Sequence, residues 1–340
     1  MERTELKDLG EFGLINRISE GIILQNVESI KGIGDDAAVI DIGEKYLLIS
    51  TDMLLEGVHF DLSYVPLKHL GYKAVAANVS DIAAMNGTPK QITVSIGMSN
   101  RFSVEAIDEF YDGIKIACET YKVDLVGGDT TSSKTGLVIS ITATGFVDKD
   151  KIVYRNGAKP NDILCVSGDL GAAYLGLQIL EREKQVFMAN PTMQPELEGK
   201  DYVIQRQLKP EARLDIIQEL QKFKIIPTAM IDISDGLASE FLHICSQSGV
   251  GGHIFEENLP IDEQTYLIAT ELNLSPITAA MNGGEDYELL FTIKQSDFEK
   301  VKNITKVLPI GYMTENKTAE LVLKSGTRAE IKAQGWQHIF

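Results

Sequence analysis

Two stretches of the chain alternate strictly between apolar and polar residues. Residues 91–98 and 137–146 place Ile, Val, Met or Ala on one face and Gln, Thr or Ser on the other. Such alternation indicates antiparallel strands with two different faces, rather than a parallel sheet that is buried on both sides. A third apolar run, 46–51, ends in Ser50-Thr51-Asp52. We therefore expect a strand there that delivers its polar end to a site.

Two segments of the first half show helical spacing instead. Apolar residues recur every three or four positions over 68–85, and the pattern stops at Asn86-Gly87 before Pro89. Residues 103–121 have the periodicity of an amphipathic helix and lie between the two alternating strands.

The second half follows a turn-rich break over residues 155–162. We place a domain boundary just before it, which gives domains 1–150 and 151–340 and a mixed α/β architecture. The expected elements beyond the break are strands 163–166, 230–233, 288–293 and 307–311, and helices from 172, over 211–222 after Pro210, over 237–248 with Asp235 as cap, and over 297–304.

Composition narrows the class of protein. The chain has 340 residues, enough for two domains, and a net charge of −17 from 49 acidic and 32 basic residues. This charge argues against binding to nucleic acid or to a membrane surface. The sequence shows neither an apolar run long enough to span a membrane nor a signal-peptide core at its start. The three cysteines fit no zinc motif, so we expect buried free thiols and a cytoplasmic protein.

Most of the conspicuous carboxylates adjoin glycine, serine or threonine, in six short segments. These are Gly34-Asp35-Asp36, Ser50-Thr51-Asp52, Ser80-Asp81, Gly127-Gly128-Asp129-Thr130, Asp232-Ile233-Ser234-Asp235-Gly236 and Gly283-Gly284-Glu285-Asp286. Carboxylate and hydroxyl oxygens are ligands that Mg²⁺ prefers, and glycine lets backbone N–H groups approach a phosphate. A pocket that gathered these segments would suit phosphoryl transfer between metal-bridged phosphates.

Each segment also has a purely structural interpretation. Any one aspartate is more often a helix cap or a turn residue than a ligand. Asp81 fits that interpretation least well, because it lies inside an expected helix with apolar neighbours. His59 is equally consistent with a substrate contact and a hydrogen-bonded loop histidine. Arg155 would ordinarily be a solvated turn residue, and Trp336 could be either a ligand-stacking ring or an anchor for the tail.

Several common nucleotide-binding motifs do not occur in the sequence. It contains neither a Walker A loop, nor a dinucleotide-binding glycine motif, nor the protein-kinase signature set. Phosphoryl transfer on this chain would therefore depend on a different scaffold.

The segments, in this order, resemble the thiamine-monophosphate kinase family. The resemblance covers residues from about 11 to the end and is carried by Gly32–Ala38, Ser50-Thr51-Asp52, Gly57–Phe60, Asn78–Gly87, Gly127–Thr131, Arg155–Pro160, Ile231–Leu237, Gly283–Leu289 and Gly335-Trp336. It implies a two-domain α/β (α+β) fold like that of aminoimidazole-ribonucleotide synthetase. The N-terminal domain would form a β-barrel with that of a second copy, and a mixed α/β C-terminal domain would complete the site.

The resemblance also implies the reaction and the site. ATP and thiamine monophosphate would give ADP and thiamine diphosphate by direct in-line transfer, with several Mg²⁺ ions and no dedicated general base. The implied metal ligands are Asp36, Ser50, Thr51, Asp52, Asp81, Asp129, Asp232 and Asp235. The implied ATP contacts are Tyr111, Gly128, Asp129, Arg155 and Ser234, and the implied substrate contacts are His59, Glu285 and Trp336.

Rival members of this superfamily fit less well. Selenophosphate synthetase would carry a reactive Cys or selenocysteine near its N-terminus, whereas the first cysteine here is Cys118. A hydrogenase-maturation dehydratase would end in a cysteine, whereas this sequence ends in Phe340. Aminoimidazole-ribonucleotide synthetase itself would lack the Gly335-Trp336 pair. A non-catalytic nucleotide-binding protein on the same scaffold is the alternative from another class.

Overall fold

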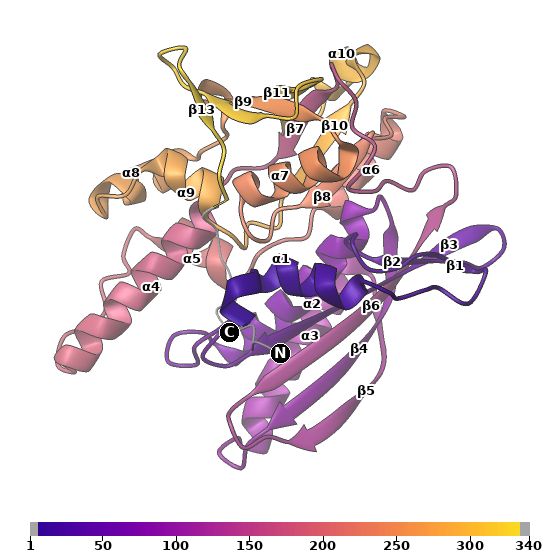
Figure 1. The fold of residues 1–340 in the computed structure, drawn as a ribbon. Coiled ribbons are helices and arrows are strands. Elements are labelled where there is room, and N and C mark those ends of the chain that lie inside the picture. The colour runs from indigo at the N-terminus through magenta and orange to yellow at the C-terminus, as the bar shows by residue number, and fades with distance from the viewer. Residues whose placement is uncertain (1–5, 334–340) are drawn as a thin grey trace.

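The computed structural model describes residues 6–333, and its strands form two sheets (Figure 1). The first sheet has six strands in the order β1-β2-β3-β6-β4-β5. Their bounds are β1 Ser29–Lys31, β2 Ala38–Asp41, β3 Lys45–Leu55, β4 Thr88–Met98, β5 Asp124–Ser132 and β6 Val138–Asp148. All pairs are antiparallel except β4 with β5, which are parallel because helix α3 connects them.

Both alternating segments form the strands that their pattern predicts. Ile92, Val94 and Ile96 of β4 are buried together with Ile139 and Ile141 of β6 in one hydrophobic cluster. Helices α2 (Leu67–Ala84) and α3 (Val104–Tyr121) pack on this apolar face and contribute to the same cluster. The polar alternates lie on the opposite face, which explains the strict period of two.

The second sheet has seven strands in the order β13-β12-β9-β11-β7-β10-β8. Their bounds are β7 Ile163–Ser167, β8 Ala229–Asp232, β9 Gly251–Phe255, β10 Leu289–Ile293, β11 Val307–Thr314, β12 Ala319–Val322 and β13 Arg328–Glu330. The remaining helices are α1 Leu6–Ser19, α4 Ala172–Ala189, α5 Asp201–Leu208, α6 Leu214–Lys222, α7 Leu237–Ser248, α8 Glu263–Glu271, α9 Pro276–Asn282 and α10 Phe298–Val301, with 3₁₀ turns η1 Glu256–Asn258 and η2 Gln295–Asp297. The mixed α/β class is therefore confirmed.

Helix α2 links the two sheets. Its buried residues Val75, Val79 and Ile82 belong to the cluster under the first sheet. At its C-terminal end, Ala83 and Ala84 instead pack in a cluster with Met230 of β8 and Phe291 of β10. Every residue from Leu70 to Ser80 is buried, as expected of a helix segment that is covered on all sides. Helix α2 therefore brings side chains from one sheet to the other.

Four local predictions differ from the structure. The strand expected over 46–51 continues to Leu55, so Ser50-Thr51-Asp52 lies within β3 and not at its end. The helix expected over 211–222 begins only at Leu214, after an irregular stretch that follows Pro210. The N-cap of α7 is Gly236, and Asp235 lies one residue before it. The helix expected over 297–304 is limited to Phe298–Val301 after a 3₁₀ turn. Each error concerns an element boundary, where local signals compete with tertiary contacts.

Within the described residues the first sheet stays open, with β1 and β5 at its two edges. A barrel would need a second copy of the chain. Strands of the first sheet end at Asp148 and those of the second begin at Ile163, and the division at residue 150 stays a prediction. In the part of the chain that the structure describes, no helix combines the length and the apolar character needed to cross a bilayer.

Candidate active site

Three aspartates that are far apart in the sequence meet between the two sheets. Asp36 precedes β2, Asp81 lies in the last turn of α2 and Asp232 ends β8. One carboxylate oxygen of each lies within 4.8 Å of the others. We call these residues the aspartate trio. Carboxylates this close repel one another unless a cation or a proton compensates them.

Hydroxyl groups orient two members of the trio. Ser80 is fully buried on α2, and its Oγ donates to Oδ2 of Asp232 at 2.6 Å. Ser50 of β3 donates through Oγ to Oδ2 of Asp81. These contacts join the first sheet, α2 and the second sheet at one point, because each partner comes from a different element.

Arg155 provides the positive charge nearest to the trio. Its Nη2 lies 2.7 Å from Oδ1 of Asp36, and its Nε donates to the same oxygen at 3.1 Å. Oδ2 of Asp36 is buried and has no hydrogen-bond partner among the described residues. A buried carboxylate oxygen without a donor is costly, so this atom is suited to a ligand that the protein itself does not supply.

The pKa values of the trio and of Asp52 reflect the crowding of negative charge. Burial, followed by repulsion from Asp52 and Asp232, raises the pKa of Asp81 well above its usual range. Burial and repulsion from Asp36 raise the pKa of Asp232 to about 7. Burial raises the pKa of Asp52 to about 6. Arg155 compensates only part of the charge of these four carboxylates. Hard oxygen ligands with this excess of negative charge fit Mg²⁺, whose charge would favour the ionised carboxylates.

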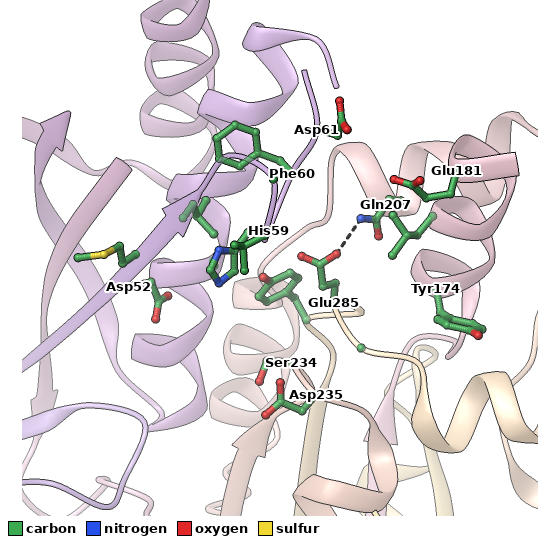
Figure 2. A pocket seen from close by; sticks show the side chains of 18 of the residues that line it. Asp52, His59, Phe60, Asp61, Tyr174, Glu181, Gln207, Ser234, Asp235 and Glu285 are labelled. Atoms are coloured by element: carbon green, nitrogen blue, oxygen red, sulfur yellow. Dashed lines mark hydrogen bonds between the residues drawn. The ribbon is translucent and has the colours of Figure 1, made fainter. Parts of the chain in front are cut away.

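A cavity of about 800 Å³ opens beside the trio (Figure 2). Asp81 and Asp232 of the trio line it together with Asp52. Its other lining residues with polar or aromatic side chains include Thr51, His59, Phe60, Asp61, Tyr64, Tyr174, Gln178, Glu181, Lys184, Gln207, Ser234, Asp235, Asn282, Glu285 and Tyr287. The first sheet, its loops and the C-terminal helices thus all contribute, and the volume is sufficient for a small organic phosphate.

Two bridges cross the cavity between the loop after β3 and helix α4. The hydroxyl of Tyr64 donates to Oε1 of Glu181 at 2.5 Å. Nζ of Lys184 lies 2.6 Å from Oδ2 of Asp61. Nζ of Lys184 also lies 3.5 Å from Oε2 of Glu181, so one ammonium partly compensates both carboxylates of this region.

His59 points into the cavity from the loop after β3 (Figure 2). Its Nδ1 accepts a hydrogen bond from the backbone N–H of Leu55 at 3.0 Å. That bond fixes the ring and leaves Nε2 as the nitrogen that carries the proton in the neutral tautomer.

The structure brings most of the predicted site residues to this cavity or to the trio. Thr51, Asp52, His59, Asp81, Asp232, Ser234, Asp235 and Glu285 line the cavity, while Asp36, Ser50 and Arg155 lie at the trio. The side chain of Thr51 forms a hydrogen bond to the neighbouring strand β6, where its Oγ1 donates to the carbonyl of Ile141 at 3.1 Å.

The other predicted residues lie elsewhere. Gly128 and Asp129 are exposed on edge strand β5, three strands from β3, which corresponds to about 14 Å. Tyr111 lies on α3, where its ring packs edge-on against Phe110. Trp336 is outside the described residues.

Sequence reasoning assigned no role at the site to Lys73, Asn78 or Ser80 of α2. Oδ1 of Asn78 accepts from the backbone N–H of Asp52 at 3.1 Å, Ser80 holds Asp232, and Lys73 reaches Glu285. All three are buried. The signal that could have found them is a set of polar residues within an otherwise apolar helix, since buried polar groups need partners.

Comparisons with known proteins agree with this architecture. The family model described as AIR synthase related protein, N-terminal domain, matches residues 34–147. The thiamine-monophosphate kinase of Aquifex aeolicus (strain VF5) is 38% identical over 333 residues, which cover 98% of this chain and 99% of the relative. The enzyme of the same name from Bacillus subtilis (strain 168) is 35% identical over 337 residues, 97% of this chain and 99% of the relative.

A solved structure extends the similarity to three dimensions. The structure described as "AaThiL complexed with AMPPCP and TMP" superposes with a TM-score of 0.84 at 35% sequence identity, over 100% of both chains. Sequence identity above 30% over nearly the whole length, with the same fold throughout, identifies the family. The chain belongs to the thiamine-monophosphate kinase family.

Proposed function

We propose that this protein transfers the γ-phosphoryl group of ATP to the phosphate of thiamine monophosphate, giving ADP and thiamine diphosphate. The observation that carries the proposal is the aspartate trio at one end of a cavity of about 800 Å³. Two features support the choice of reactants. Relatives that align with nearly the whole chain are named thiamine-monophosphate kinase, and the similar AaThiL structure is described as a complex with AMPPCP and TMP.

The proposed metal ligands are Asp36, Ser50, Thr51, Asp52, Asp81, Asp129, Asp232 and Asp235. Bound Mg²⁺ would supply positive charge that neutralises the phosphates during transfer. The chain's own part is to hold these carboxylates in place, as Ser50 and Ser80 do for Asp81 and Asp232. Asp129 lies on edge strand β5, so it would act at a further ion.

The remaining site residues have proposed roles in binding the two substrates. Tyr111, Gly128, Arg155 and Ser234 would contact ATP, and His59, Glu285 and Trp336 would contact thiamine monophosphate. Transfer forms a bond between a phosphate oxygen of thiamine monophosphate and the γ-phosphorus, and breaks the bond from that phosphorus to the bridging β,γ-oxygen. The attacking oxygen is already ionised at neutral pH, so the residues need only orient it.

We also propose a homodimer in which the first sheets of two copies form a barrel. Edge strand β5 is exposed along its whole length, and it carries Leu125 and Val126 at 41% and 60% exposure. An uncovered apolar edge strand is a surface for pairing with another chain. A cytoplasmic location fits the three free cysteines, two of which are buried.

The decisive measurement is ADP release with Mg-ATP and either thiamine monophosphate or thiamine as acceptor. We expect turnover with the monophosphate alone. Asp52→Asn keeps the volume of the side chain but removes its charge, and should lower turnover at least about 100-fold. Tight Mg-ATP binding without turnover on the monophosphate would instead support a nucleotide-binding regulatory protein.

A further inference from the structure

Lys73 is a buried lysine of α2 whose ammonium group reaches the candidate active site. Its side chain is 5% exposed, and Nζ lies 2.8 Å from Oε1 of Glu285. Nζ also donates to the backbone carbonyl of Gln207 at 3.2 Å. Lysine is rarely buried to this degree without a charged partner. Glu285 is therefore the group that Lys73 is placed to meet.

Glu285 is held at both carboxylate oxygens, by side chains from two helices. Oε1 pairs with Lys73. Oε2 accepts from Nε2 of Gln207, in the last turn of α5, at 2.7 Å (Figure 2). Its backbone N–H donates to the carbonyl of Ser234 at 2.7 Å. With a φ of 63°, Glu285 occupies the left-handed region that disfavours side chains. These contacts hold Glu285 in a strained backbone conformation, while its side chain remains 28% exposed and faces the cavity.

The position of Lys73 on α2 links the two ends of the cavity. Lys73, Ala77 and Asp81 are spaced by four residues, so they lie along one face of the helix. Ala77 and Asp81 both line the cavity. The rise of a helix separates Lys73 from Asp81 by about 12 Å. One helix face therefore carries a carboxylate of the aspartate trio and, about two turns away, an ammonium that contacts Glu285.

We infer that Lys73 is a positioning residue for Glu285. It fixes the direction of the Glu285 carboxylate and compensates its charge, so that this carboxylate accepts a hydrogen bond from the thiamine-bearing part of the substrate. This role rests on the proposed function. Because donors occupy both of its oxygens, Glu285 is a fixed acceptor and does not compete with the aspartate trio for divalent cations. The effect of Lys73 should be confined to the acceptor substrate and leave ATP binding unchanged.

A double-mutant cycle tests this role. The variants are Lys73→Met, Glu285→Gln and the combination of both, assayed for kcat and for the KM of each substrate. We expect Lys73→Met to raise the KM for thiamine monophosphate about tenfold, because a tenfold change corresponds to the loss of about one charge-assisted hydrogen bond. The KM for ATP should change little. The double variant should be no worse than Glu285→Gln alone, because Lys73 acts only through Glu285.

Thermal unfolding gives a readout that needs no activity. Lys73→Met leaves a carboxylate without its ion-pair partner and should lower the Tm, whereas the double variant removes both charges and should recover part of that loss. Lys68→Met is the matched control, because Lys68 is an exposed lysine of the same helix. It should change neither the KM values nor the Tm.

The outcomes separate this role from the proposed function. Two results would overturn the positioning role alone. One is a loss of activity in the double variant that equals the product of the losses in the two single variants. The other is an equal rise in the KM for ATP and the KM for thiamine monophosphate in Lys73→Met. If the wild-type protein releases no ADP with thiamine monophosphate, the proposed function fails and the role falls with it. Should Lys73→Met not fold, comparison of the double variant with Glu285→Gln gives the same decision.

Discussion

The charge of each carboxylate at the cavity depends on the neighbour that it faces. Glu285 faces Lys73, and Asp61 faces Lys184, each across less than 3 Å. Asp81 faces two other aspartates and the hydroxyl of Ser50 instead. Carboxylates therefore differ in their roles. One that is paired with a lysine offers a hydrogen-bond acceptor, whereas a group of carboxylates that share a single arginine attracts cations.

Replacing Asp81 by asparagine should affect activity and stability in opposite directions. The change removes a proposed metal ligand, so turnover should fall at least about 100-fold. It also removes a charge that burial and neighbouring aspartates oppose, so the metal-free protein should gain about 1–2 kcal/mol in its free energy of unfolding. Activity assays and urea unfolding in EDTA would measure both effects. Asp112→Asn, at an exposed ion pair on α3, should change neither.

The same repulsion predicts a pH dependence for Asp232. Its pKa is about 7 in the folded protein against about 3.9 in an unfolded chain. The folded state therefore retains a proton that the unfolded state has lost, so this group destabilises the metal-free protein increasingly as the pH rises from about 4 to 7. The Tm of Asp232→Asn minus that of the wild type, measured in EDTA, should grow over this window.

The comparison between variants is needed because other groups titrate in the same range. Burial lowers the pKa of His243 to about 4, which contributes stability that is lost as the pH falls below about 6.5. That slope has the opposite sign and cancels in the difference between the two proteins. A difference that stayed constant from pH 5 to 7 would contradict the assignment of Asp232.

At the scale of elements, the contact between α2 and α3 determines how precisely α2 is placed. The two helices approach so closely that a Cβ atom at Gly113 would lie 1.9 Å from the carbonyl oxygen of Lys68, and one at Gly71 would lie 2.1 Å from that of Phe110. Backbone atoms cannot move aside as side chains do. Glycine at these positions allows α2 to lie between the sheets with Asn78, Ser80 and Asp81 in position.

Gly113→Ala should therefore destabilise the protein although alanine favours helices. Overpacking against a backbone carbonyl should cost about 1–3 kcal/mol, more than the gain of about 1 kcal/mol in helix propensity. Because α2 would shift, turnover should fall as well. Gly97→Ala is the matched control, since a Cβ there meets its nearest neighbour at 3.6 Å. Thermal unfolding that ranked Gly97→Ala as the worse variant would contradict this account.

At the scale of the whole molecule, the open edge of the first sheet is the surface that the proposed dimer explains. Val126→Lys places a charge on the exposed strand β5 and should convert a dimer into monomers, since charged residues on an edge strand oppose pairing. Light scattering after gel filtration would measure the mass of each species. Lys122→Glu, a charge change just before β5 at the C-cap of α3, serves as the control. A wild-type protein that runs as a monomer would contradict the dimer.

The sequence by itself determined the local structure and the chemistry of the parts. Alternation over 91–98 and 137–146 gave the strands, because a period of two follows from the geometry of a single strand. Apolar spacing gave α2 and α3 for the same local reason. The acidic segments, taken in order, also indicated the family before any contact was known.

Only the tertiary structure decided which of these parts meet. That Asp36, Asp81 and Asp232 converge while Asp129 lies on an edge strand depends on how α2 packs between two sheets. The pairing of Lys73 with Glu285 likewise joins residues that are far apart in the sequence. Local periodicity reflects interactions along one element, whereas convergence depends on long-range packing, which no single segment encodes.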